Sequence, residues 1–495
     1  MSRPHRTDAR GGIRWIIPAC FFLSGASGLI YEILWTRDLV EIIGGAPHAV
    51  SIILTVFMAG LGAGSFWAGR HVDRLAAPRL MAAYGLLELA IAAWAGLVPW
   101  LLAGTRPLQA FLYNRFYDQT FVYHGLTFAV CAAVLLPPVL CMGATLPILC
   151  RYCVDELAHL GRHAGRLYGL NTLGAALGTL ACGFYLIERW GVTGALGAAV
   201  AINGTIGLGC LLLGLARQRA AGAPRKAKPQ PAPDTVPAPT ADRERLAALV
   251  VFAVSGFCAM SCEVLWTKLL ALIVGPTTFS FTIVLVTFIG GLALGSLVFG
   301  VLADRVRDPL ALLVWTQAAA GILLLLVSHA LGHTQLFFAK LIFTFKDQFA
   351  LLNALKAAVL FGFMILPTLL FGASFPLVGK ICVRSVSQVG RTLGSAYMVN
   401  TVGSLLGPFV AGFVLLPLLG KEAGLRLTAG LQLATCIGVA ALAARGRPSA
   451  RTMRMAGAAA ALGLILCTQF PAWSQRQLSA GKYQDFEETR SLLAR

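Results

Sequence analysis

Apolar residues occur in long unbroken runs along most of this chain, and short polar clusters separate the runs. Many runs reach roughly 20 residues, which is the length that an α-helix needs to cross a lipid bilayer. The pattern predicts spans at 13–36, 48–70, 78–103, 124–150, 164–187 and 192–215, and again at 246–268, 279–303, 309–331, 350–380, 392–419 and 424–444. A shorter, alanine-rich run at 454–473 predicts a thirteenth span.

Three segments lack this apolar character. Residues 1–12 form a basic tail, and residues 474–495 form a polar tail. Residues 217–245 are rich in proline, alanine and charge, so they cannot bury a core and predict a disordered linker. The chain is therefore expected to consist of a six-helix unit at 13–216 and a second at 246–444, followed by the extra span.

The two units repeat one another in sequence, motif by motif and in the same order. Matching positions are Gly60, Gly64, Asp73, Arg74, Asn171 and Gly174 in the first unit, and Gly291, Gly295, Asp304, Arg305, Asn400 and Gly403 in the second. An even number of spans leaves both copies in the same orientation across the membrane. The expected fold is an all-α integral membrane protein of two parallel six-helix repeats, with a path between them.

Composition supports a membrane protein and excludes a large soluble domain. Hydrophobic residues make up 57% of the chain and charged residues only 12%, with a mean hydropathy of +0.76. The net charge of +19 is concentrated in every second loop, which is the positive-inside pattern. We therefore expect contact with anionic lipid and no nucleic-acid partner. A cytoplasmic N-terminus and a plasma membrane location (the inner membrane in a bacterium) follow from the same pattern.

Carboxylates inside apolar spans are costly, so they usually face a cavity or a partner. Glu32 and Glu263 occupy the same place in the two repeats, which allows them to face each other across the central path. They would then suit a small organic cation such as a polyamine, or a proton relay. Alternatively, they pair locally with Arg37 and Lys268 near the outer interface. Glu88 has no charged counterpart, which favours a structural hydrogen bond.

Two asparagines are further candidates for binding a substrate. Asn171 and Asn400 each precede a pair of glycines with GxxxG spacing, which permits close helix contact. Their amides could stabilise that contact by hydrogen bonds, or they could line the path.

The sequences GSFWAGRHVDR and GSLVFGVLADR stand between the second and third spans of the two units. Their spacing resembles the signature loop of major-facilitator transporters. In that interpretation Asp73, Arg74, Asp304 and Arg305 make contacts across the bundle that change with conformation. The alternative is an ordinary charged turn. Mixed aromatic and charged segments outside the third span of each unit predict helices lying at the outer surface.

No nucleophile–base set, metal cluster or phosphate-binding loop stands out in the sequence. We therefore predict no catalytic residues, no metal site and no cofactor.

Several motifs in combination, SGASGLIYEILWTR, GLGAGSFWAGRHVDR, LLPPVLCMGATLP and GRLYGLNTLGAALG, resemble the membrane domain of spermidine-synthase-like fused proteins. That resemblance implies a polyamine-related membrane domain joined to an aminopropyltransferase. The glycine-rich loop that binds the aminopropyl donor in that family is absent, so no catalytic residue is carried over. Two hypotheses remain: a transporter-like protein for a small organic cation, or a membrane anchor for a separately encoded aminopropyltransferase.

Overall fold

The computed structural model describes residues 8–43, 46–220, 239–275, 278–443 and 450–469, together with Trp473. Within these residues every regular element is a helix. The expectation of an all-α membrane fold is therefore confirmed. The predicted tail at 474–495 and most of the predicted linker lie outside the described residues, and so does the start of the N-terminal tail.

The first half contains seven α-helices. They are α1 (Asp8–Ile43), α2 (Ala46–Val72), α3 (Ala77–Gly104), α4 (Arg106–Phe116), α5 (Thr120–Cys153), α6 (Leu160–Ala181) and α7 (Ile187–Ala220), with a 3₁₀ turn at Leu157–His159 and a π-helical turn at Cys182–Leu186. The helix α4 is one of the predicted outer-surface helices, and the other six provide the predicted spans.

The second half repeats this order. Its helices are α8 (Pro239–Val274), α9 (Thr278–Ala303), α10 (Pro309–Gly332), α11 (Gln335–Thr344), α12 (Phe349–Gly372), α13 (Ser374–Cys382), α14 (Val389–Val410) and α15 (Leu416–Ala443), with a 3₁₀ turn at Val386–Gln388 and a π-helical turn at Ala411–Leu415. The last helix, α16 (Ala450–Gln469), corresponds to the predicted thirteenth span.

Eleven continuous helical segments are long and apolar enough to cross a membrane within the described residues. Two of them, at 157–220 and 386–443, are 64 and 58 residues long. Each reverses direction at a glycine with positive φ, Gly191 at 69° and Gly420 at 79°. Because a side chain is strained in that conformation, glycine suits both turns. Each long segment therefore supplies two spans, which gives the arrangement of six, six and one.

The predicted linker is shorter than the sequence suggested. Helix α7 continues to Ala220 and α8 already begins at Pro239, so only 221–238 remain outside the described helices. The N-terminal tail is shortened in the same way, because α1 begins at Asp8. Alanine and arginine, which are frequent at these borders, are strong helix formers and let the spans extend beyond the apolar runs.

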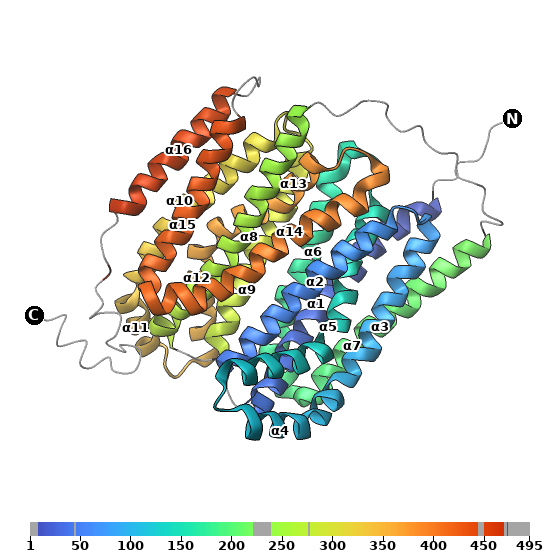
Figure 1. The fold of residues 1–495 in the computed structure, drawn as a ribbon, viewed down its shortest axis with the longest axis horizontal. Coiled ribbons are helices and arrows are strands. Elements are labelled where there is room, and N and C mark those ends of the chain that lie inside the picture. Colours follow the sequence, from blue (N-terminus) through green and yellow to red (C-terminus); the bar gives the residue numbers. More distant parts are fainter. Residues whose placement is uncertain are drawn as a thin grey trace, which may run out of the picture.

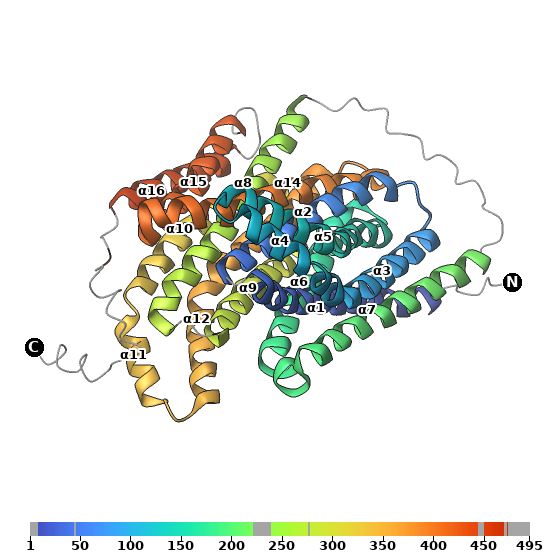
Figure 2. The ribbon, with the colours of Figure 1, turned by 60° about the horizontal axis from the view of Figure 1, so that its bottom comes forward.

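The two halves lie side by side with their helices roughly parallel (Figure 1). They meet along two seams, where α2 packs on α14 and α6 packs on α9. The short helices α4 and α11 lie at one end of the bundle, and α13 lies toward the other (Figure 1). Helix α16 packs outside this core against α10 and α15, at the edge seen in Figure 2.

Glycines bring the helices of each half into backbone contact. A Cβ added at Gly174 of α6 would lie 1.9 Å from the carbonyl oxygen of Phe22 in α1. A Cβ added at Gly403 of α14 would lie 2.0 Å from the carbonyl oxygen of Ala253 in α8. The packing role predicted for the GxxxG pairs is therefore confirmed in both halves.

Candidate functional site

A cavity of about 250 Å³ lies between the two halves. Its wall comes from α1, α2, α5 and α6 on one side and from α8, α9, α12, α13 and α14 on the other. Repeat-related residues contribute in pairs, among them Phe21 with Phe252, Ser24 with Ser255, Asn171 with Asn400 and Tyr168 with Tyr397. The parallel repeat therefore encloses a central cavity with approximate two-fold symmetry.

Glu32 of α1 and Glu263 of α8 both line this cavity. Each of these two side chains is half-buried. They are the charged side chains of the described lining, which otherwise consists of apolar, aromatic, methionine and small polar residues. The cavity is therefore a mostly apolar site with two acids in its wall.

The alternative local ion pairs are not formed. Arg37 and Lys268 are exposed, and neither pairs with Glu32 or Glu263 among the ion pairs of the described residues. In a helix, side chains three and four residues apart share a face, whereas Glu32 and Arg37 are separated by a further step. The same spacing applies to Glu263 and Lys268. The cations point to the surface while the acids point to the cavity.

Aromatic rings pack together in the wall of the cavity. Phe375 of α13 stacks on Tyr168 of α6 at 4.6 Å between ring centroids and lies edge-on to Tyr397 of α14 at 6.2 Å. Phe252 of α8 lies 6.3 Å from Phe375. All four rings belong to the cavity wall, and Tyr168 and Tyr397 occupy matching places in α6 and α14.

Asn171 and Asn400 combine the two roles that the sequence left open. The Asn171 amide donates to the carbonyl oxygen of Phe21 at 2.9 Å, and the Asn400 amide donates to that of Phe252 at 2.8 Å. Both asparagines also line the cavity. Each amide thus ties a cavity-lining helix to its neighbour, which fixes the wall around the two acids.

Beyond the aromatic cluster, Asp73 joins the two halves. It follows α2 in the first half, and its carboxylate accepts hydrogen bonds from the backbone N–H groups of Gly390 at 2.9 Å and Arg391 at 2.8 Å. These donors lie in the first turn of α14, where unpaired N–H groups and the helix dipole favour an anion. Burial raises the pKa of the Asp73 carboxyl, while the backbone donors and Arg151 act in the opposite direction.

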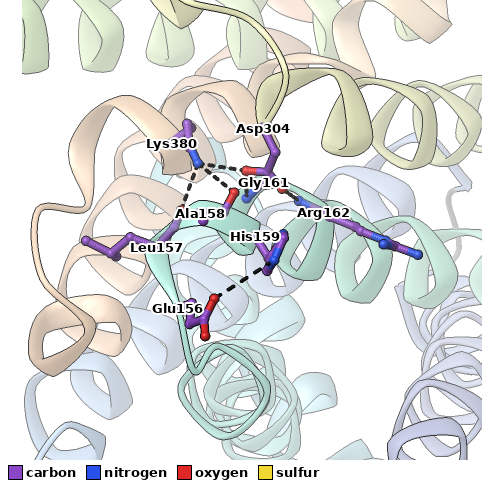
Figure 3. Close-up of polar contacts among 8 residues, drawn as sticks. All are labelled: Glu156, Leu157, Ala158, His159, Gly161, Arg162, Asp304 and Lys380. Atoms are coloured by element: carbon purple, nitrogen blue, oxygen red, sulfur yellow. Dashed lines mark hydrogen bonds and ion pairs between the residues drawn. The ribbon is translucent and has the colours of Figure 1, made fainter.

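Asp304 makes the repeat-related contact in the reverse direction (Figure 3). It follows α9 in the second half and accepts from the N–H groups of Gly161 at 3.0 Å and Arg162 at 2.8 Å, in the first turn of α6. The Lys380 ammonium donates to Asp304 at 2.8 Å and also to the backbone carbonyl of Leu157 at 2.7 Å. Each half therefore caps a helix of the other half.

The predicted contacts of Arg74 and Arg305 are not formed. Both side chains are exposed, and neither takes part in an ion pair among the described residues. Consecutive residues at a helix end point in different directions, so only the aspartate of each pair reaches the opposite half. The basic partners are instead Arg151, 3.6 Å from Asp73, and Lys380. Sequence analysis missed them, although they occupy matching places in the two repeats.

Glu88 lies outside the cavity wall, in the interior of the first half. Its side chain is fully buried, accepts a hydrogen bond from the Ser24 hydroxyl at 2.7 Å and accepts a second from the Asn203 amide. The hydrogen bond that the sequence favoured for this residue is confirmed.

Among the described residues there is no group of three or more His, Cys, Asp or Glu side chains placed to hold a metal ion. The two cavity acids could supply carboxylate oxygens to a bound cation, and the rest of the wall consists of apolar and aromatic residues, methionines and neutral polar residues.

The Major Facilitator Superfamily family model matches residues 16–408. Among solved structures, a bacterial homologue of the iron transporter ferroportin, in an outward-facing state, superimposes with a TM-score of 0.59 and 12% sequence identity. The alignment covers 88% of this chain and 100% of that one. No curated protein matches. None of these comparisons supports the resemblance to spermidine-synthase-like proteins, so the polyamine and aminopropyltransferase hypotheses stay predictions.

Proposed function

The chain belongs to the Major Facilitator Superfamily, and on that premise we propose that it carries a small organic cation across the membrane through the cavity that Glu32 and Glu263 line. The two acids carry the proposal, because the cavity holds both of them and no cationic side chain of the described lining neutralises them. A carboxylate inside a membrane protein without such a partner favours a cation that arrives from solution.

The rest of the wall indicates what kind of cation would fit. Aromatic rings attract cations through their faces, and methionine side chains adapt to irregular apolar groups. Tyr168, Phe375 and Tyr397 contribute such rings to the cavity wall. An amine with an apolar body is therefore the substrate class that we favour. A polyamine is the finer candidate, since its separated charges could engage both acids at once.

The contacts of Asp73 and Asp304 support alternating access. They join the two halves at one end of the bundle, and we propose that the cavity opens to solvent at the other end in this conformation. Basic residues concentrate at the Asp73–Asp304 end, among them Arg70, Arg74, Arg162, Arg166 and Arg217. The positive-inside rule favours a cytoplasmic location for this end, and this supports the proposal of a cytoplasmic N-terminus and an outward-facing state.

Uptake into proteoliposomes tests the proposal. Purified full-length protein would be assayed with spermidine and with methylphenylpyridinium, an aromatic monovalent cation. We expect saturable transport of at least one of them, reduced by Glu32→Gln or Glu263→Gln and abolished by the double variant. Glu41→Gln is the matched control, because Glu41 is exposed and pairs with Arg106 outside the cavity. It should transport like the wild type.

Two results would count against the proposal. Undiminished transport by the double variant would remove the two acids from the path. Transport of a divalent metal ion, with no competition from either organic cation, would replace the substrate class. Accumulation of spermidine but not of methylphenylpyridinium would instead narrow the substrate to a polyamine.

A further inference from the structure

Glu88 is a buried acid that the transport path does not use directly. It lies in α3 with no exposed surface, and no ion pair neutralises it among the described residues. Its hydrogen-bond donors, Ser24 and Asn203, are both neutral. A buried charge without a countercharge is costly, so such a group is stable only when it is held by donors or takes up a proton.

Ser24 links this acid to the cavity. Its hydroxyl donates to Oε1 of Glu88 at 2.7 Å, and the same residue belongs to the cavity wall. On the other side, the Tyr31 hydroxyl donates to the Asn203 carbonyl oxygen at 2.9 Å, and the Asn203 amide donates to Oε2 of Glu88. A single hydrogen bond thus separates a fully buried carboxylate from the substrate site.

We propose that Glu88 is a proton-binding site coupled to the central cavity through the Ser24 hydroxyl. The proposal rests on the function proposed above. A proton from hydronium in the water that reaches the cavity forms an O–H bond on Oε1 of Glu88. Ser24 then changes from donor to acceptor, and its own hydrogen turns toward the cavity. The O–H bond of hydronium breaks as the O–H bond on Glu88 forms, and a neutral water molecule is left in the cavity.

This exchange makes proton and substrate binding compete. With Glu88 ionised, Ser24 turns oxygen lone pairs toward the cavity, and a negative charge lies behind them, so a cation is favoured. With Glu88 protonated, that charge is lost and the Ser24 hydrogen faces the cation. Substrate binding therefore releases the proton, and the proton expels the substrate. Coupling of this kind is reciprocal in the binding free energies.

The neighbours of Glu88 contain no cation that would replace the proton. From α1, the titratable side chains facing it are Cys20 and Tyr31, from α7 it is Cys210, and from α3 itself it is Tyr84. Helix α5, which also packs on α3, contributes no charged partner to it within the described chain. All of these groups are neutral thiols and phenols when protonated.

Glu88→Gln is a suitable test because it keeps the shape and removes the charge. An amide is also tolerated at the corresponding helix contact of the second half, where Gln317 of α10 meets Gln432 of α15. Infrared difference spectra between acidic and alkaline buffer should show the carbonyl band of a titrating carboxylic acid in the wild type. Glu88→Gln should lack that band, whereas Glu41→Gln should keep it. An unchanged spectrum in Glu88→Gln overturns the proton site.

The coupling is measured separately, in proteoliposomes with spermidine or methylphenylpyridinium. Glu88→Gln should retain exchange of labelled for unlabelled substrate and lose accumulation driven by a pH gradient. On acidification, the affinity of the wild-type protein for the cation should fall by a factor at least about fivefold larger than the factor for Glu88→Gln. Glu32 and Glu263 are present in both proteins, so the comparison removes their contribution to the pH dependence. An equal loss of exchange and gradient-driven transport overturns the coupling.

Ser24→Ala distinguishes a link from a packing role. It should shift the infrared band of Glu88, because the band responds to the lost hydrogen bond, and it should weaken the pH dependence of substrate affinity. If wild-type protein moves neither cation, the proposed transport function fails, whereas the infrared titration still decides whether Glu88 binds a proton.

Discussion

The two halves of this protein contribute matching residues to the central cavity and differ in their interiors. Both place a glutamate, an asparagine and a tyrosine in the cavity wall, and both cap a helix of the other half with an aspartate. Behind the wall, the first half buries the acid Glu88 against Asn203, while the second buries the neutral pair Gln317 and Gln432.

A second difference concerns the tryptophans that follow the two cavity acids. Trp266 donates its indole N–H to Ser328 at 2.9 Å, whereas the buried indole N–H of Trp35 has no partner. The features present in both halves are the close helix contacts, the residues of the cavity wall and the aspartates that cap a helix of the other half. Features present once are the places to look for what one half does alone.

The largest expected effect comes from the feature that the halves share most strictly, the glycine contacts. Gly174→Ala and Gly403→Ala each place a Cβ about 2 Å from a backbone carbonyl oxygen, so the paired helices must separate. We expect each variant to lose at least about 2 kcal/mol of stability, or to fail to accumulate folded. Thermal unfolding followed by size-exclusion chromatography measures the loss.

Gly209→Ala on α7 is the control for these variants, because a Cβ there meets nothing within 4 Å. It should keep the wild-type midpoint or raise it slightly. If only one of the two glycine variants lost a large part of its stability, the glycine contacts of the two halves would not be equivalent.

Gln317→Glu copies the buried acid into the second half. Gln317 donates to the carbonyl oxygen of Leu370 at 3.0 Å, and an ionised glutamate has no hydrogen to donate there. We expect a loss of about 1–3 kcal/mol in alkaline buffer. The loss should be smaller in acidic buffer, where the protonated acid can donate as glutamine does. Thermal midpoints across a pH series check this, and a pH-independent loss would contradict it.

The two aspartate contacts should differ in strength. Asp304 has a hydrogen-bonded lysine at 2.8 Å, whereas Arg151 stands 3.6 Å from Asp73. Charge-assisted hydrogen bonds contribute about 1.5–3 kcal/mol, so Asp304→Asn should open this end of the bundle more often than Asp73→Asn. Distances between spin labels on the two halves measure the opening. Equal opening in both variants would mean that the helix caps alone hold the halves together.

The sequence predicts most of the fold because its signals are local and repeated. The apolar runs place the spans, and the match between Gly174 and Gly403 predicts the close helix contacts. Helix ends are less well predicted, since alanine and arginine extend α7 and α8 into the segment that composition assigns to a linker. The breaks predicted at 187–192 and 419–424 enclose the turns at Gly191 and Gly420, whereas the positive φ of these glycines becomes visible only in the structure.

The site was predicted in part, for a physical reason. The repeat pairs Glu32 with Glu263, but it cannot show which face of a helix meets the cavity. The partners of Asp73 and Asp304 belong to distant helices, so a motif at the loop suggests the neighbouring arginines instead. Lys380 could have been found by aligning it with Arg151, because both are cations at matching positions.

The smallest expected effect concerns the tryptophan pair. Ser328→Ala removes the acceptor of the Trp266 N–H and leaves the second half as the first half already is, with a buried indole donor unpaired. We expect a loss of about 1 kcal/mol, near the net value of one hydrogen bond. Thr435→Ala is the control, because the Thr435 hydroxyl bonds only to the backbone of its own helix. If Ser328→Ala lowers the stability no more than this control does, the unpaired indole of Trp35 does not reduce the stability of the first half.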